Sequence, residues 1–129
     1  MSLTARKITP MQVVEDMDAA AEAFAALGFQ PVSTDAGCPC PCTGWQADNG
    51  STVVVMPRQL IAQEFGEEIA ARVANRALSY IFVECVPDAL EDLGESAKVI
   101  AQTVTSYGTV EAIVETAGGP MIIAERVEE

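Results

Sequence analysis

The sequence contains no histidine. Histidine is the commonest general base and the commonest zinc ligand, so its absence excludes every catalytic triad that relies on imidazole. Basic residues are scarce as well, because seven lysines and arginines stand against 19 acidic residues and give a net charge of −12. Nucleic-acid affinity comes largely from lysine and arginine releasing counterions, so we expect no nucleic-acid partner. The same charge argues against docking on an anionic membrane surface.

Long hydrophobic runs are also lacking. Half of the 129 residues are apolar, yet no run approaches the roughly 20 residues that a transmembrane helix needs. The N-terminus does not show a charged region, an apolar stretch and a cleavage site in series, so we expect no secretory leader. The composition indicates an acidic, cytoplasmic protein that folds as one compact domain.

The clearest structural signal is a hairpin over Tyr107–Arg126. In its first half apolar residues alternate with Glu111 and Glu115, which is the period of two of a half-buried strand. Gly119 can adopt positive φ, as a tight turn requires, and a second apolar run follows it. A fainter copy of this pattern surrounds Gly50, which lies 69 residues before Gly119.

The other patterns predict a strand, a helix and three strands, then a connector, then the same five elements again. Asp16 or Asp18 caps the first helix, and Asp88 opens the second, whose apolar stripe extends to Ala101. Pro10 cannot donate a ladder hydrogen bond and places the first strand at an edge or a bulge. Asp18 and Asp88 lie 70 residues apart, close to the spacing of the glycines, which indicates an internal duplication. The expected segments are a first βαβββ module in residues 1–57, a helical connector in 58–76 and a second βαβββ module in 77–129.

Three segments resemble the vicinal oxygen chelate superfamily: ITPMQVVEDMDAAAEAF, GFQPVSTD and IVETAGGPMIIAER. This superfamily includes glyoxalase I, the bleomycin-resistance proteins and the extradiol dioxygenases. Asp16, Phe24 and Leu27-Gly28-Phe29 stand where the family has an acidic residue, an aromatic residue and a Leu-Gly-Phe turn. The resemblance implies an α+β fold, in which two βαβββ modules form a shared curved mixed sheet with helices on the convex side. It also implies a cleft between the modules and a homodimer.

The family's metal ligands lie on the first and last strands of each module. Carried over to this sequence, the first-strand positions fall on Thr9 and Ser79, and the last-strand positions on Val54 and Ile123. None of these offers the imidazole, carboxylate or thiolate that first-row metals prefer, so we expect no metal and no other cofactor. The alternative, a metal-dependent lyase or dioxygenase, would use an atypical ligand set: Gln12, Glu84, Glu111 and Glu125.

In place of a metal centre, the resemblance implies an apolar cleft with a few hydroxyls. This composition is typical of a small-molecule pocket, although the same residues can equally fill a core between sheet and helices. Methionine suits such a pocket because it packs around irregular ligands. The expected lining residues are Thr9, Met11, Val13, Val54, Met56, Ser79, Ile81, Met121 and Ile123.

Cys38, Cys40 and Cys42 alternate with two prolines. Three thiolates in this array suit Zn²⁺ or Cu(I), which makes a thiol or soft-metal site the second alternative. The spacing is not that of a zinc finger, and no basic residue close in sequence activates the thiols.

Glu111 and Glu115 share one face of a strand, and we interpret that face as solvated. Tyr80, Tyr107 and Trp45 are interpreted as ordinary sheet aromatics, with ligand contact as the alternative. The sequence therefore favours a metal-free binding protein of the glyoxalase/bleomycin-resistance type with a small organic ligand, and leaves catalysis undecided.

Overall fold

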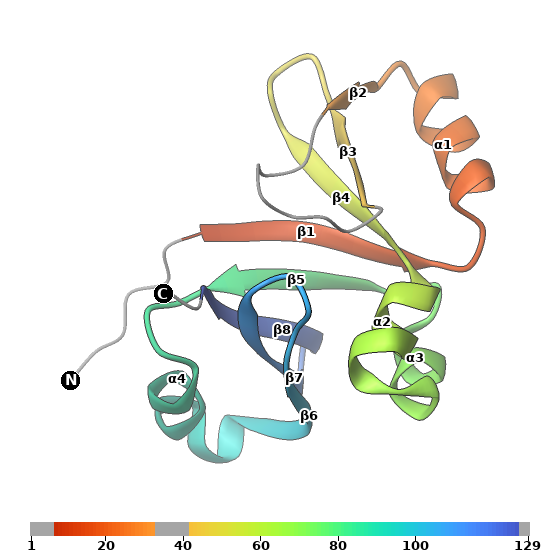
Figure 1. Ribbon diagram of the computed structural model, residues 1–129. Helices are drawn as coiled ribbons and strands as arrows, with labels where there is room; N and C mark the ends of the chain where they lie inside the picture. Colours follow the sequence, from red (N-terminus) through yellow and green to blue (C-terminus); the bar gives the residue numbers. More distant parts are fainter. Residues whose placement is uncertain (1–6, 33–41, 127–129) are drawn as a thin grey trace.

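The structure is a computed structural model that describes residues 7–32 and 42–126. One eight-stranded mixed sheet runs through it in the order β2-β3-β4-β1-β5-β8-β7-β6 (Figure 1). The strands are β1 (Lys7–Val14), β2 (Gln30–Val32), β3 (Thr43–Gln46), β4 (Thr52–Pro57), β5 (Ala77–Phe82), β6 (Ala97–Val104), β7 (Thr109–Thr116) and β8 (Gly119–Arg126). The central strands β1 and β5 are antiparallel, and each pairs in parallel with the last strand of its half, β4 or β8. The expected α+β fold with a curved mixed sheet is therefore confirmed.

The helices lie on both faces of this sheet. They are α1 (Met17–Ala26), α2 (Arg58–Phe65), α3 (Glu67–Val73), α4 (Val86–Leu93) and the 3₁₀ turn η1 (Gly94–Ser96). Residues directly opposite each other on neighbouring strands point to the same face, so Met11, Val54 and Leu78 share one face. We call this the connector face, because α2 and α3 pack on it. The other face, which carries Val55 and Ile123, is called the outer face.

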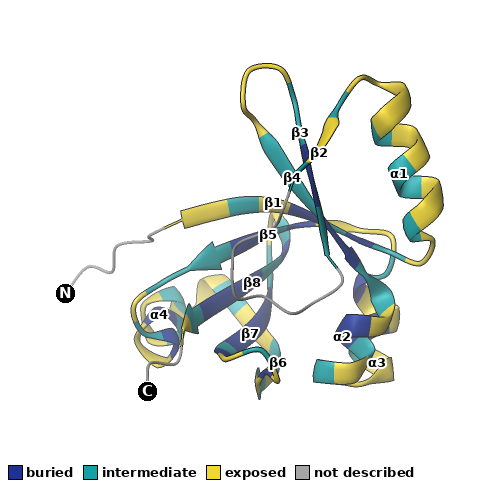
Figure 2. Cartoon of the chain, turned by 45° about the horizontal axis from the view of Figure 1, so that its top comes forward, coloured by how far each residue is buried: buried dark blue, intermediate teal, exposed yellow. Residues whose placement is uncertain are grey.

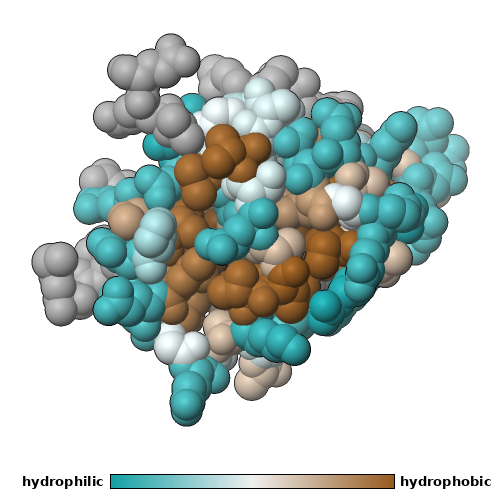
Figure 3. Space-filling model, turned by 60° about the horizontal axis from the view of Figure 1, so that its bottom comes forward, coloured by the Kyte–Doolittle hydropathy of each residue, from teal (hydrophilic) through white to brown (hydrophobic). Residues whose placement is uncertain are grey.

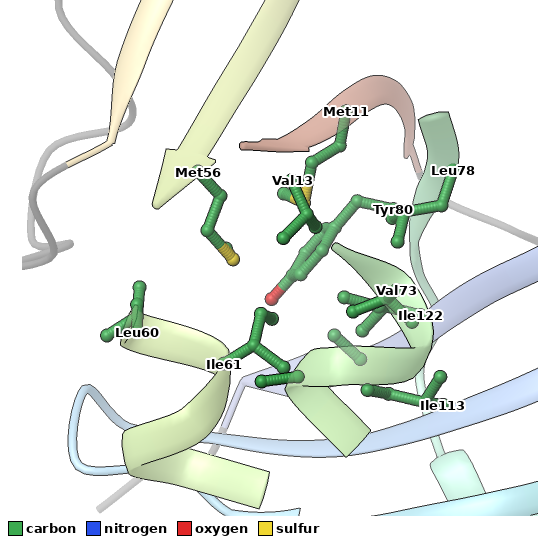
Figure 4. Packing of buried hydrophobic residues seen from close by; sticks show 12 residues of the cluster. Met11, Val13, Met56, Leu60, Ile61, Val73, Leu78, Tyr80, Ile113 and Ile122 are labelled. Atoms are coloured by element: carbon green, nitrogen blue, oxygen red, sulfur yellow. The ribbon is translucent and has the colours of Figure 1, made fainter. Parts of the chain in front are cut away.

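The connector face holds the larger hydrophobic core. Leu60 and Ile61 of α2 and Val73 of α3 pack on Met11, Tyr80 and their neighbours in β1, β5 and β8 (Figure 4). These residues are almost fully buried, and Figure 2 shows the same contrast between buried strands and a largely exposed α1.

On the outer face, α4 packs through Val86 and Ala89 on Ala112 and Ile123. Phe24 of α1 stacks on Trp45, with 5.9 Å between ring centroids. The expectation that helices cover one side of the sheet thus describes α1 and α4, whereas the connector helices lie on the opposite face.

Three local expectations are corrected. The helix that begins at Val86 ends at Leu93, because Gly94 adopts φ +51°, and the residues up to Ala101 belong to β6, where β-branched side chains are abundant. Gly66 is not helical: with φ +101° it separates α2 from α3. β1 is not an edge strand, since Pro10 merely precedes the segment that pairs with β4.

The two halves repeat with an offset one residue shorter than the aspartates indicate. The N-cap of α1 is Asp16, whose Oδ1 accepts a 2.9 Å hydrogen bond from the Ala19 amide, and the N-cap of α4 is Cys85, 69 residues later. Met11 lies opposite Val54 in the first half, as Tyr80 lies opposite Ile122 in the second. The first strands therefore match at an offset of 69, which keeps both side chains on the connector face.

Within the described ranges, no helix is long and apolar enough to cross a membrane. Large apolar side chains that remain exposed include Ile8, Leu27 and Val104. In Figure 3 apolar surface gathers in the middle of the face shown and is bordered by hydrophilic side chains. Apolar surface of this kind often marks an interaction site, and the expected homodimer stays a prediction.

Candidate functional site

The buried polar residues of the described chain gather at one place. They are Thr105, Thr109 and Glu111, and all three lie at the end of β6 or the start of β7. Glu111 is fully buried, although charged residues are almost never fully buried unless they are paired. This concentration makes the start of β7 the first candidate for a functional site.

Neutral hydroxyl groups surround the Glu111 carboxyl group. The Thr109 hydroxyl donates to Glu111 Oε2 at 2.7 Å, and the Tyr80 hydroxyl donates to the same oxygen. The Tyr107 hydroxyl donates to Oε1 over a longer distance of 3.3 Å. Thr105 completes the network through a 2.7 Å hydrogen bond between its Oγ1 and Thr109 Oγ1. We call these five residues the Glu111 cluster.

Burial decides the electrostatics of the cluster. It raises the pKa of Glu111, and the hydrogen bonds from the three hydroxyls oppose this shift without cancelling it. Burial and the nearby Glu111 also raise the pKa of Tyr80 and of Tyr107. The pKa of the half-buried Cys42 thiol is raised to about 12 for the same two reasons. The cluster therefore combines a carboxyl that is easily protonated with phenols and a thiol that stay neutral.

The alternation of β7 brings Glu111 to the connector face. Glu111 lies opposite Ala124, and Ile113 lies opposite Ile122, so both side chains point toward the core beneath α2. The interpretation of Glu111 as part of a solvated face is wrong, because the connector helices cover this face. It holds better for Glu115, which is half-buried and pairs with Arg76 at 3.5 Å.

The turn before β7 is attached to α2. Glu64 of α2 accepts hydrogen bonds from the Ser106 amide at 2.8 Å and from the Ser106 hydroxyl at 2.7 Å. These bonds hold α2 beside Tyr107, and the Tyr80 hydroxyl points into the space between the sheet and α2 (Figure 4). Half-buried residues, among them Cys42, Val54 and Phe82, border this core.

The nine expected pocket residues divide between the two faces. Five lie on the connector face: Thr9, Met11, Val13, Val54 and Met56. Four lie on the outer face: Ser79, Ile81, Met121 and Ile123. The cause is the assumed offset of 70, because a shift of one residue turns a strand's side chains to the opposite face. The residues that the sequence analysis missed as pocket candidates are Leu78, Tyr80 and Ile122, which occupy the corresponding places on the connector face.

The family-type metal positions divide in the same way. Thr9 and Val54 lie on the connector face, and Ser79 and Ile123 on the outer face, so the four do not converge. In the described connector face, the only carboxylate near the core is Glu111, and three hydroxyls already engage it. This donor set does not fit a first-row metal, which prefers several imidazole, carboxylate or thiolate ligands.

The atypical ligand set does not assemble either. Gln12 and Glu125 point to the outer face, opposite to Glu111, and Glu125 accepts a 2.7 Å hydrogen bond from the Val86 amide at the start of α4. Glu84 is exposed between β5 and α4. Within residues 7–32 and 42–126, no group of three histidine, cysteine, aspartate or glutamate side chains is placed to hold a metal ion.

Of the three alternating cysteines, only Cys42 lies within the described residues, and Cys38 and Cys40 lie outside them. The raised pKa of Cys42 keeps its thiol protonated, which is the opposite of what a nucleophile or a soft-metal ligand needs. The fourth cysteine, Cys85, caps α4. The thiol alternative thus gains no support from Cys42.

Comparison with protein-family models and with curated proteins finds no match. Solved structures do match. A glyoxalase/bleomycin resistance protein/dioxygenase superfamily member from Vibrio splendidus 12B01 matches with a TM-score of 0.56 at 15% identity, over 96% of this chain and 99% of that one. The fold is glyoxalase-like. The NAD-dependent benzaldehyde dehydrogenase from Legionella pneumophila matches with a TM-score of 0.65 at 12% identity, over 93% of this chain and 99% of that one. At these identities the likeness extends to the fold alone.

Proposed function

We propose that this protein binds a small organic molecule without a metal ion, on the connector face where the two halves of the glyoxalase-like sheet meet. The observation that carries the proposal is the gathering of Thr105, Thr109 and Glu111 at one point of an otherwise apolar face. Small-molecule sites combine an apolar lining with a few convergent polar groups, which is this composition. A functional site also explains why a carboxyl group is kept in a costly environment.

Both halves of the chain contribute to the proposed site. Thr9 of the first half lies opposite Tyr80 of the second across the β1–β5 pair. Val54 and Phe82 are half-buried and lie at the border of the core, so a bound molecule would contact residues of both halves there. Met11 and Met56 extend this surface with side chains that adapt to irregular shapes.

The test uses a neutral apolar dye, Nile red, and two matched variants. Val54→Trp fills the connector face, whereas Val53→Trp adds the same volume one residue away on the outer face. We expect saturable dye binding to the wild type in EDTA, at least a tenfold loss of affinity in Val54→Trp, and retention in Val53→Trp. Melting temperatures of both variants check that each is folded.

Two outcomes would overturn the proposal. One is the absence of saturable binding, or equal losses in the two variants. The other is binding that EDTA abolishes and that Zn²⁺, Ni²⁺ or Mn²⁺ restores, which would favour a metal-dependent protein.

A further inference from the structure

The Glu111 carboxyl group receives hydrogen bonds but no positive charge. Its donors are the neutral hydroxyls of Tyr80, Tyr107 and Thr109. The one charged group among those that shift its pKa is Glu64 of α2, which is itself acidic. Three donors suit an ionised carboxylate, whereas burial without a cation favours the neutral acid, so the two charge states compete.

The basic side chains near this part of the sheet are occupied elsewhere. Arg76 pairs with Glu115 at 3.5 Å, and Arg58 pairs with Glu67. The Arg126 guanidinium lies 5.9 Å from the centroid of the Phe82 ring and is not among the groups that shift the pKa of Glu111. A countercharge for Glu111 would therefore have to come from a bound molecule.

We infer that the Glu111 cluster recognises the protonated nitrogen of an organic amine, with Glu111 Oε1 as its acceptor and the neighbouring aromatic rings around its apolar part. This inference rests on the proposed binding function and deepens it. Oε2 already accepts two hydrogen bonds, but Oε1 accepts one over 3.3 Å and has room for a stronger, charged donor.

The surroundings favour a cation over a neutral or anionic group. The rings of Tyr80 and Phe82 pack edge to face at 5.2 Å, and Tyr107 borders the same core, so aromatic faces are available for cation–π contacts. The net charge of −12 attracts cations and repels anions at long range. Glu111 is fully buried, whereas Tyr107 and Cys42 beside it are half-buried, which makes their side of the cluster the route of entry.

Binding of an amine to this site is linked to protons. The titratable groups that face Glu111 are Tyr80 from β5, Tyr107 from the turn before β7, Cys42 before β3 and Glu64 from α2. The pKa values of the tyrosines and of Cys42 are raised, so these groups keep their protons at neutral pH. An ammonium ion needs the ionised carboxylate, and Glu111 must release its proton to solvent when it starts protonated. Affinity should fall about tenfold per pH unit below the pKa of Glu111.

The experiment compares phenethylamine with phenethyl alcohol, which has nearly the same shape and no charge at neutral pH. Binding to the wild type, Glu111→Gln and Glu115→Gln is measured by calorimetry or ligand-observed NMR from pH 5 to 8. Glu115→Gln is the matched control, because Glu115 lies on the same strand and the same face and loses the same charge. We expect the amine to bind the wild type and Glu115→Gln at least tenfold more tightly than the alcohol at pH 8, and Glu111→Gln to lose that preference.

The outcomes separate this inference from the proposed function. If amine and alcohol bind the wild type equally, or if the preference survives in Glu111→Gln, the amine inference is wrong while the proposed function stands. If neither molecule binds and Nile red also fails, both are wrong. Should Glu111→Gln fail to fold, calorimetry of the wild type in two buffers of different ionisation enthalpy decides, because an amine that binds without proton release between pH 5 and 8 overturns the inference.

Discussion

Glu111→Gln is expected to change how the stability of this protein depends on pH. The substitution keeps the shape of the side chain and removes its titration. Burial raises the pKa of Glu111 above the value of 4.5 that an exposed glutamate has, so the folded state holds this proton more tightly than the unfolded state. The contribution of Glu111 to stability is therefore complete below about pH 4.5 and is lost as pH rises through its pKa in the folded protein.

The magnitude follows from the linkage between protonation and folding. Between the two pKa values, the free energy of unfolding of the wild type should fall by about 1.4 kcal/mol per pH unit relative to Glu111→Gln. The hydroxyl donors reduce this loss, because each hydrogen bond to a charged group contributes about 1.5–3 kcal/mol. Above the pKa of Glu111 the difference between the two proteins becomes constant.

The assay is urea unfolding of both proteins at half-unit steps from pH 4 to 9. Subtracting the two curves removes the contributions of the other acidic residues, and Glu115→Gln, whose carboxylate is half-exposed and paired with Arg76, serves as the control with a nearly flat difference. A flat difference for Glu111→Gln, or one in which the wild type gains stability with pH, would refute the reasoning. Three hydroxyls would then outweigh burial and keep the carboxylate charged.

Three further predictions concern the fold. Gly66→Ala should lower the free energy of unfolding by about 1–3 kcal/mol, because φ +101° strains any residue with a Cβ, whereas Gly118→Ala should cost little, since Gly118 has no positive φ and its added Cβ would be 3.8 Å from the Thr116 hydroxyl; equal urea midpoints would contradict this. Asp16→Ala should cost about 1 kcal/mol in the same assay, because it removes the cap on the Ala19 amide, and no change would argue against the cap. Sedimentation should show a homodimer at micromolar concentration, because β2 and β6 leave the ends of the sheet open, and a single species of 13.6 kDa would exclude it.

The secondary structure could be predicted largely from local patterns. Alternating apolar residues identified β1, β4, β7 and β8, and Asp16 was among the expected caps. The prediction failed where two local signals competed. Residues 97–101 satisfied a helical spacing, but Gly94 ends α4 before them, and the β-branched residues that follow pair with β7. Pro10 signalled an edge strand, yet its missing donor is tolerated in the centre because the β4 pairing begins one residue later.

The site depended on information that lies between strands. A period of two correctly placed Glu111 and Glu115 on one face of β7, but it says nothing about what covers that face. The connector helices cover it near Glu111 and leave Glu115 half-exposed, so the two glutamates differ in environment although their local sequence is alike. A useful signal was the polar series Thr105, Tyr107, Thr109 and Glu111 at alternate positions before an apolar strand.

The sequence by itself determined the chemistry that this protein lacks and the order of its elements. The absence of histidine and the apolar residues at the expected ligand positions are properties of composition, and the repeated order of strands and helices follows from short-range periodicity. Only the tertiary structure decided the register of the repeat, because an offset of 69 or 70 looks alike in sequence but places Tyr80 or Ser79 on the face of Met11. It also decided that Glu111 is buried among hydroxyls, since burial is set by α2, which packs across the sheet from a distant part of the chain.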